Sequence, residues 1–372
     1  MFNLITIKFK AMKMKRFTLF ALFLAGMVSF VACEKDDTKD LNKDEAQQQI
    51  TNAEQELLTK SGEIVATDGY KVQEYFATQL PSPFYVKSDV SKSVVPSRFQ
   101  KAYELTRQNL LLENPEIEFH FDYFLIEFFN DVKGTWTWAP DGWTHESTPT
   151  DKVIVKFPYP ATNATNNVTI TYYDFTTTLV YGETVPTGIK VKIEKDGNQV
   201  FSMVYSATIA NMMKYSTKVT VTFGPFEISN EESFDASVNN KVLYSKNFTF
   251  KKDGKLFYSE DADLTITVVS EQSADILITA KQVIGNLEFR LKIDGNGNEL
   301  ETGNPNDFAS LSVYTTGGDK VGDFVFVEEE GYWVLYFKFT NGEQVKAETL
   351  MPLVSERFYS FIDDLFSNLI FK

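Results

Sequence analysis

The residues best suited to nucleophilic or metal chemistry are few in this chain: one cysteine, Cys33, and two histidines, His120 and His145. A serine or cysteine nucleophile needs a general base within hydrogen-bond reach, and the sequence has neither a G-x-S-x-G elbow nor an S-x-x-K pair. Zinc ligands usually occur at short spacings such as H-E-x-x-H or C-x-x-C, and neither spacing occurs. We therefore predict no catalytic residues, no metal ligands and no cofactor, and interpret both histidines as structural.

The acidic residues offer two other chemistries. Asp294, Asn296 and Asn298 match positions one, three and five of a calcium-binding loop, but Glu299 replaces its glycine and Pro305 replaces its last carboxylate. A polar hairpin loop is the better interpretation of this segment. Paired carboxylates could hydrolyse a glycoside, yet nothing in the sequence selects one pair among 51 acidic residues. An undetected hydrolase is the third of our function hypotheses.

Tryptophan is concentrated in the segment "GTWTWAPDGW", which holds Trp136, Trp138 and Trp143. Trp136 and Trp138 are two residues apart and would share one face of a strand. Exposed aromatic rings bind sugars or form the centre of protein interfaces, so these three residues are our candidate binding platform. The competing interpretation is that the rings cover one end of a core.

The only cysteine follows an apolar run. Basic residues precede an apolar segment over residues 17–32, which is the layout of a secretory signal. Val31, Ala32 and Cys33 resemble the lipobox of bacterial lipoproteins, although Phe30 stands where leucine is usual. This resemblance implies a signal peptide over residues 1–32, with Met14 as the expected start, and lipidation of the Cys33 thiol.

The residues that follow are acidic: Glu34, Lys35, Asp36 and Asp37. This run is similar to the export signal of surface-exposed lipoproteins of the Bacteroidota, and the whole resemblance covers residues 14–37. It implies a lipid-anchored outer-membrane protein that faces the cell surface; a periplasm-facing anchor is the alternative. Residues 33–43 would then be the lipidated cysteine and a flexible, charged tether.

Charge limits the partners. The chain has 51 acidic and 36 basic residues, a net charge of −15, and the signal removes five more basic residues. No basic stripe remains that could follow a phosphate backbone, so we predict no nucleic-acid partner. The expected partners are the membrane, through the lipid anchor, and a glycan or protein ligand.

Hydrophobic periodicity predicts helices at both ends of the mature chain. Apolar residues recur at helical spacing over 44–80, with a break expected at "SGE" (residues 61–63), and a third stripe follows Pro96. We assign 44–115 to a helical region. The last segment, 351–372, has one broad apolar face and is predicted to be an amphipathic helix packed on the sheet.

Between these helices the period changes to two. Segments such as "NVTITYY", "GIKVKIEK" and "YWVLYFKF" alternate apolar and polar residues over strand lengths. Turn dipeptides separate them, at Asp196-Gly197, Asp253-Gly254, Asp294-Gly295 and Asn341-Gly342. We predict a β-dominated α+β fold with a large antiparallel, hairpin-rich sheet over 116–350, arranged as a sandwich or a curved half-barrel. Similar segments at Lys190 and Arg290 suggest two related halves, or hairpins that look alike by chance.

The leading hypothesis is a lipid-anchored, surface-exposed, non-enzymatic binding protein whose ligand is a glycan, a protein or a partner outer-membrane component. The alternative is an outer-membrane lipoprotein that carries or chaperones an apolar ligand. Abundant phenylalanine, 33 residues, and a broad sheet suggest this second role.

Overall fold

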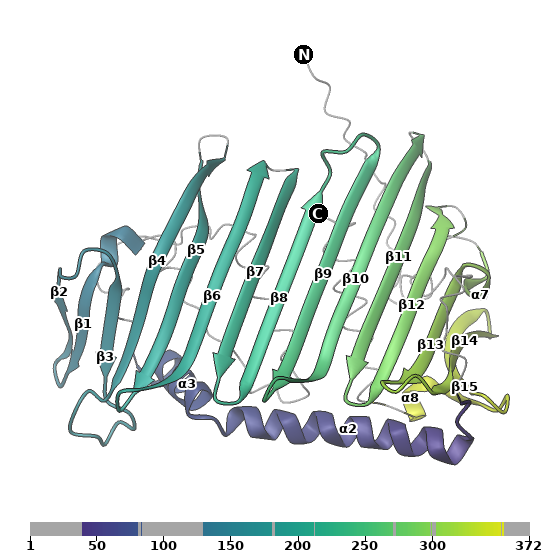
Figure 1. Cartoon of the computed structure of the whole chain (residues 1–372), viewed down its shortest axis with the longest axis horizontal. Helices are drawn as coiled ribbons and strands as arrows, with labels where there is room; N and C mark the ends of the chain where they lie inside the picture. Colours follow the sequence, from purple (N-terminus) through teal and green to yellow (C-terminus); the bar gives the residue numbers. More distant parts are fainter. Residues whose placement is uncertain are drawn as a thin grey trace.

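The computed structural model describes residues 39–80, 83, 129–180, 183–211, 213–270, 273–297, 299, 303–350 and 352. The described residues form one broad, open β-sheet with a long helix along one end of its strands (Figure 1). The predicted β-dominated α+β fold is confirmed, and its sheet is a single open layer of 16 strands, not a two-sheet sandwich.

Sixteen strands form this sheet among the described residues. They are β1 Gly134–Ala139, β2 Gly142–Glu146, β3 Val153–Phe157, β4 Val168–Val180, β5 Glu183–Lys195, β6 Asn198–Asn211, β7 Lys214–Phe223, β8 Phe226–Asp235, β9 Lys241–Lys252, β10 Lys255–Ser270, β11 Ser273–Ile284, β12 Leu287–Asn296, β13 Ala309–Thr315, β14 Lys320–Glu329, β15 Tyr332–Phe339 and β16 Gln344–Lys346. The described helices are α2 Lys43–Val65, α3 Asp68–Gln79, α7 Pro305–Phe308 and α8 Ala347–Leu350.

The sheet is a meander in which each strand from β4 to β16 pairs with its neighbours in the chain. All of these pairs are antiparallel, as short hairpin connections require. The exception is at the β2 edge, where β3 returns beside β1 and pairs with it in parallel. The β1–β2 hairpin therefore forms one edge of the sheet.

Two-residue turns close the β5–β6, β7–β8, β9–β10 and β11–β12 hairpins at the end of the sheet that lies along α2, which we call the lower end (Figure 1). Asp196-Gly197 and Asp253-Gly254 have positive φ at both residues, as predicted for these dipeptides. The prediction for Asp294-Gly295 was wrong, because both residues lie inside β12 and pair with Leu277 and Ile276. Backbone pairing on β11 overrides the turn preference of the aspartate–glycine sequence.

The core lies on one face of the sheet, which we call the core face; the opposite face is the outer face. Alternation along the strands buries residues such as Phe248 and Phe250 on the core face, while Asn247 and Lys251 on either side of them reach the outer face. Aromatic rings pack against one another there, as in the Phe250–Phe257 pair with ring centroids 4.5 Å apart. Burial of these rings supplies much of the driving force for folding.

Helix α2 begins with a capping box, in which Asn42 accepts from the Glu45 backbone and Glu45 accepts from the Asn42 backbone. It runs through the predicted "SGE" break and ends at Val65, so that prediction was wrong. Thr67 caps α3 by accepting from the Tyr70 backbone amide. Among the described residues, no helix is long and apolar enough to cross a bilayer.

Helices α2 and α3 follow the lower end of the sheet across successive turns (Figure 1). Buried residues of both helices belong to the same core as the phenylalanines of the sheet. On α2, Ala53 packs next to Gly285 and Glu63 forms an ion pair with Lys252. At the start of α3, Thr67 packs next to Gly224 and Asp68 forms an ion pair with Lys195.

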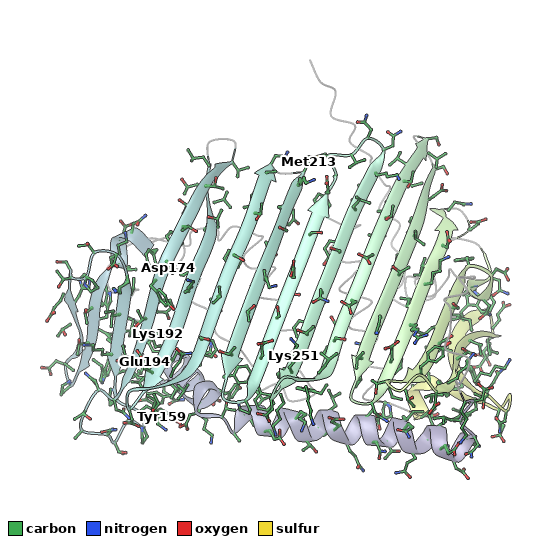
Figure 2. All side chains as sticks on the ribbon, viewed as in Figure 1. Tyr159, Asp174, Lys192, Glu194, Met213 and Lys251 are labelled. Carbon is green, nitrogen blue, oxygen red and sulfur yellow. The ribbon has the colours of Figure 1, made fainter. Side chains whose placement is uncertain are left out.

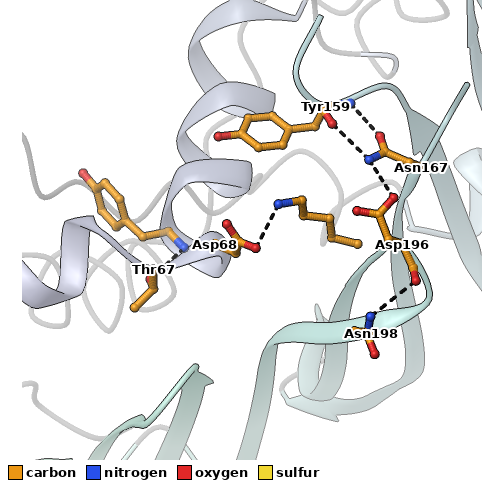
Figure 3. Close-up of polar contacts among 8 residues, drawn as sticks. Thr67, Asp68, Tyr159, Asn167, Asp196 and Asn198 are labelled. Atoms are coloured by element: carbon orange, nitrogen blue, oxygen red, sulfur yellow. Dashed lines mark hydrogen bonds and ion pairs between the residues drawn. The ribbon is translucent and has the colours of Figure 1, made fainter. Parts of the chain in front are cut away.

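A polar joint fastens the start of α3 to the β5–β6 turn (Figure 3). The Lys195 ammonium lies 2.8 Å from the Asp68 carboxylate and 5.5 Å from the ring centroid of Tyr159. Asn167 accepts from the Tyr159 amide at 2.8 Å and donates to the Tyr159 carbonyl at 3.0 Å and to the Asp196 carboxylate at 3.1 Å. These contacts connect the start of α3, the β3–β4 connection and the β5–β6 turn.

Several predicted features lie outside the described residues. These are the signal peptide, most of the helical region from 81 to 115, and all of the predicted C-terminal helix except Pro352. The similar segments at Lys190 and Arg290 lie in β5 and β12, two strands of one continuous sheet.

Candidate functional site

The residues that carry the lipoprotein resemblance, Cys33 and Glu34–Asp37, lie outside the described residues, as does His120. His145 lies on β2, where its ring is 4.2 Å from the Trp136 ring and its Nε2 is 3.0 Å from the Lys133 carbonyl. Both contacts are those of a packed side chain.

The three tryptophans of the candidate platform lie together on the edge hairpin β1–β2. Trp136 is 2% exposed and donates from its indole nitrogen to the Val132 carbonyl at 2.9 Å, so it is part of the core. Trp138 and Trp143 are directly opposite each other on the two strands, with ring centroids 5.1 Å apart in an edge-to-face arrangement. Both are only partly buried. Only this pair of the three keeps ring surface that a ligand could reach.

The first part of the segment with calcium-like spacing, Asp294 to Asn296, belongs to β12 and not to a hairpin loop, so that interpretation was wrong for these residues, and Asn298 lies outside the described residues. Asp294 lies on β12 and pairs with Lys292 at 2.8 Å, while Asn296 and Glu299 bond each other through side chain and backbone. In the part of the chain that the structure describes, no group of three or more His, Cys, Asp or Glu residues is placed to hold a metal ion.

A group of polar residues lies on the core face at the centre of the sheet, and the sequence analysis did not single it out. We call it the buried polar cluster; it extends over β8 to β11. Cross-strand pairing places Asn230, Phe248, Glu260 and Gln282 in one row. Its members are Asn230, Glu232, Lys246, Tyr258, Glu260 and Gln282.

The centre of this cluster is an ion pair. Lys246 Nζ lies 2.7 Å from Glu260 Oε2, and each side chain is 1% exposed. The Tyr258 hydroxyl donates to Glu260 Oε1 and accepts from Gln282 Nε2 at 3.0 Å. A buried charge is tolerated only when it is paired and hydrogen-bonded, and this arrangement meets that condition for Glu260.

In the two side-chain amides of the cluster, only the nitrogen atoms have hydrogen-bond partners. Asn230 Nδ2 donates to Glu232 Oε1 at 3.1 Å, and the oxygens Asn230 Oδ1 and Gln282 Oε1 have no hydrogen-bond partner. A buried acceptor without a partner costs about 1–3 kcal/mol. Because the cluster lies away from solvent, we interpret it as a structural feature of the core.

The outer face carries ion-paired charged side chains along its strands, together with the exposed apolar side chains of Val204, Leu243 and Leu277. Lys192 pairs with Glu194 at 2.9 Å and Lys251 with Glu227 at 3.0 Å, and Figure 2 labels the first two residues and Lys251. Such exposed pairs contribute little to stability.

One outer-face carboxylate is held ionised by its neighbours. Partial burial alone would raise the pKa of Glu288, but hydrogen bonds and charge from Lys281 and Arg290 lower it below its usual range. Both cations lie 2.7 Å from this carboxylate. Glu288 is therefore a poor candidate for a general acid near neutral pH.

The strand ends opposite α2 expose apolar side chains, and we call this row of hairpin ends the rim. Leu179 and Val269 are 72% and 62% exposed, and Met213 and Val238 are about half exposed. They lie at the β4–β5, β10–β11, β6–β7 and β8–β9 connections respectively. Figure 2 labels Met213 at this end and Tyr159 at the lower end. Sequence reasoning missed the rim because none of these residues belongs to a recognisable motif.

No family model matches this chain, and no curated protein matches it either.

Proposed function

We propose that this chain is a lipid-anchored, cell-surface binding protein of the outer membrane without enzymatic activity, and that its rim contacts the ligand. The observation that carries the proposal is the row of exposed apolar side chains at four hairpin ends. Apolar area left in water is unfavourable, and grouped exposed apolar residues commonly mark an interaction site.

The contrast with the outer face supports this choice. Charged residues on that face pair with one another, as Lys218 does with Glu231 at 3.0 Å. Val204, at 41% the most exposed of the three apolar side chains named on that face, is less exposed than any of the four rim residues. A ligand there would have to replace existing ion pairs, whereas a ligand at the rim would bury apolar area that has no partner among the described residues.

The carrier hypothesis receives less support. It requires apolar side chains that are available to a ligand, but the large phenylalanines of the core face are already buried. Phe248 and Phe250 are at most 1% exposed, and Phe250 packs on Phe226 and Phe257.

The lipid anchor is tested by metabolic labelling with a fatty-acid analogue. We expect label in the wild-type protein and none in Cys33→Ala, and cleavage of the wild-type protein by protease added to intact cells. Label that persists in Cys33→Ala would reject the anchor, and protection from protease on intact cells would reject surface exposure.

The rim is tested by site-specific photocrosslinking on living cells. A photoreactive residue at Met213 should give discrete adducts, while the same residue at Leu58, which is 50% exposed on α2, serves as the matched control. Equal crosslinking at both positions, or none at Met213, would contradict binding at the rim.

A further inference from the structure

The first described residues are fixed to one corner of the sheet and do not hang free. Leu41 is 5% exposed, its amide donates to the Lys320 carbonyl at 2.9 Å, and the Lys320 amide donates to the Lys39 carbonyl at 3.0 Å. The Thr340 hydroxyl donates to the Leu41 carbonyl at 2.7 Å. This corner, at the lower ends of β14 and β15, is therefore where the chain enters the folded body.

The chain that precedes this corner is short. Six Cα–Cα steps separate Cys33 from Lys39, so even a fully extended chain reaches about 20 Å. The 16 residues of β10 make a strand about 50 Å long. The tether is thus too short to bring the rim to the surface that holds the lipid while the corner stays attached.

Charge works against a body that lies flat on the membrane. The net charge of the chain is −15 and becomes more negative when the basic signal is removed. An anionic membrane surface repels such a body. Helix α2 is itself acidic, with five acidic and two basic residues, so the tether and not charge selects the end that stays near the membrane.

We propose that α2 and the lower ends of β13–β16 face the membrane, and that the rim points away from it (Figure 1). This orientation rests on the lipid anchor of the proposed function. It makes the rim the first surface that an approaching glycan or protein meets. It also assigns a role to the contacts of residues 39–43, which set the orientation of the sheet.

Energy transfer to a labelled bilayer tests the orientation. The lipidated Cys33 leaves no other thiol in the chain, so single cysteines can be introduced as Leu58→Cys on α2 and Met213→Cys on the rim. Each lipoprotein, labelled with one donor dye, is reconstituted into phosphatidylethanolamine–phosphatidylglycerol vesicles that carry an acceptor-labelled lipid. We expect transfer at least threefold stronger from Leu58→Cys than from Met213→Cys.

Vesicle flotation separates the two ways to fail. If the protein with Cys33 does not float with the vesicles, the anchor is rejected, and the orientation with it. If it floats but both labels transfer equally, or the rim label transfers more, the orientation alone is rejected. A flexible insertion of about 20 residues after Asp37 is the matched control, and it should reduce transfer from Leu58→Cys because the chain can then extend much further.

Discussion

The two ends of the same strands are built differently. At the lower end, two-residue turns with left-handed residues such as Asp253 and Gly254 lie next to α2 and α3 (Figure 1), and side chains of the helices complete the core. At the rim, the connections carry exposed apolar residues such as Leu179 and Val269. An apolar residue at the lower end therefore contributes to the stability of the fold, whereas an apolar residue at the rim offers surface to a ligand.

Two leucines test this difference with the same substitution. Leu57 on α2 is 4% exposed and Leu179 at the rim is 72% exposed. Leu57→Ala should lower the free energy of unfolding by about 2–5 kcal/mol because it leaves a cavity, whereas Leu179→Ala should change it by less than about 0.5 kcal/mol. Urea unfolding followed by circular dichroism measures both. A comparable loss for Leu179→Ala would show that the rim is packed, and the contrast would fail.

Two glycines near the lower end provide a second, smaller contrast. An added Cβ meets no atom within 4 Å at Gly254 or at Gly62, so only backbone conformation decides the outcome. Gly254 has φ +75°, which costs an alanine about 1–2 kcal/mol. Gly62 lies inside α2, where alanine should gain about 0.5–1 kcal/mol. If both substitutions to alanine changed the free energy of unfolding in the same direction relative to the wild type, the turn geometry would be contradicted.

The smallest effect is expected at the rim end of β8. Lys214 and Ser237 lower the pKa of Asp235 from 3.8 to about 2. A lowered folded pKa stabilises the protein above the unfolded value, and this contribution is lost as the pH falls from 3.8 through about 2. Asp235→Asn should flatten the dependence of stability on pH in this window. Carboxyl NMR titration checks the pKa directly, and Lys214→Met should move it upward.

The sequence predicted the sheet well because the period-two pattern depends only on which face is buried. It failed at Asp294-Gly295, where pairing with β11 decides the conformation, and at the "SGE" segment, where tertiary packing carries α2 past a glycine. The helix breaks instead between Val65 and Asp68, and Thr67, a residue type that is common at helix N-caps, indicated this position in the sequence.

The candidate sites were harder to predict. The spacing of Trp136 and Trp138 correctly placed both rings on one face, but only the structure separates the buried ring from the half-buried one. The sequence did indicate the buried polar cluster, because Lys246 in "KNFTF" is two residues from Phe248 and four from Phe250 and therefore shares their face of the strand. The rim had none, because exposure at a hairpin end depends on which end the helices cover.

The buried polar cluster has a consequence for how so repetitive a sheet finds its pairing. A shift of one residue between two strands exchanges buried and exposed faces and is forbidden by the hydrophobic pattern. A shift of two residues keeps every side chain on its own face, so the pattern alone does not prevent it. In the native register Lys246 lies opposite Ala262 and Phe248 opposite Glu260. A slip between β9 and β10 that moved Lys246 opposite Leu264 would separate Lys246 from Glu260 and leave two charges unpaired in an apolar core, a loss of several kcal/mol. The ion pair thus opposes a slip of β9 along β10 in that direction, which the alternation of apolar and polar residues does not prevent.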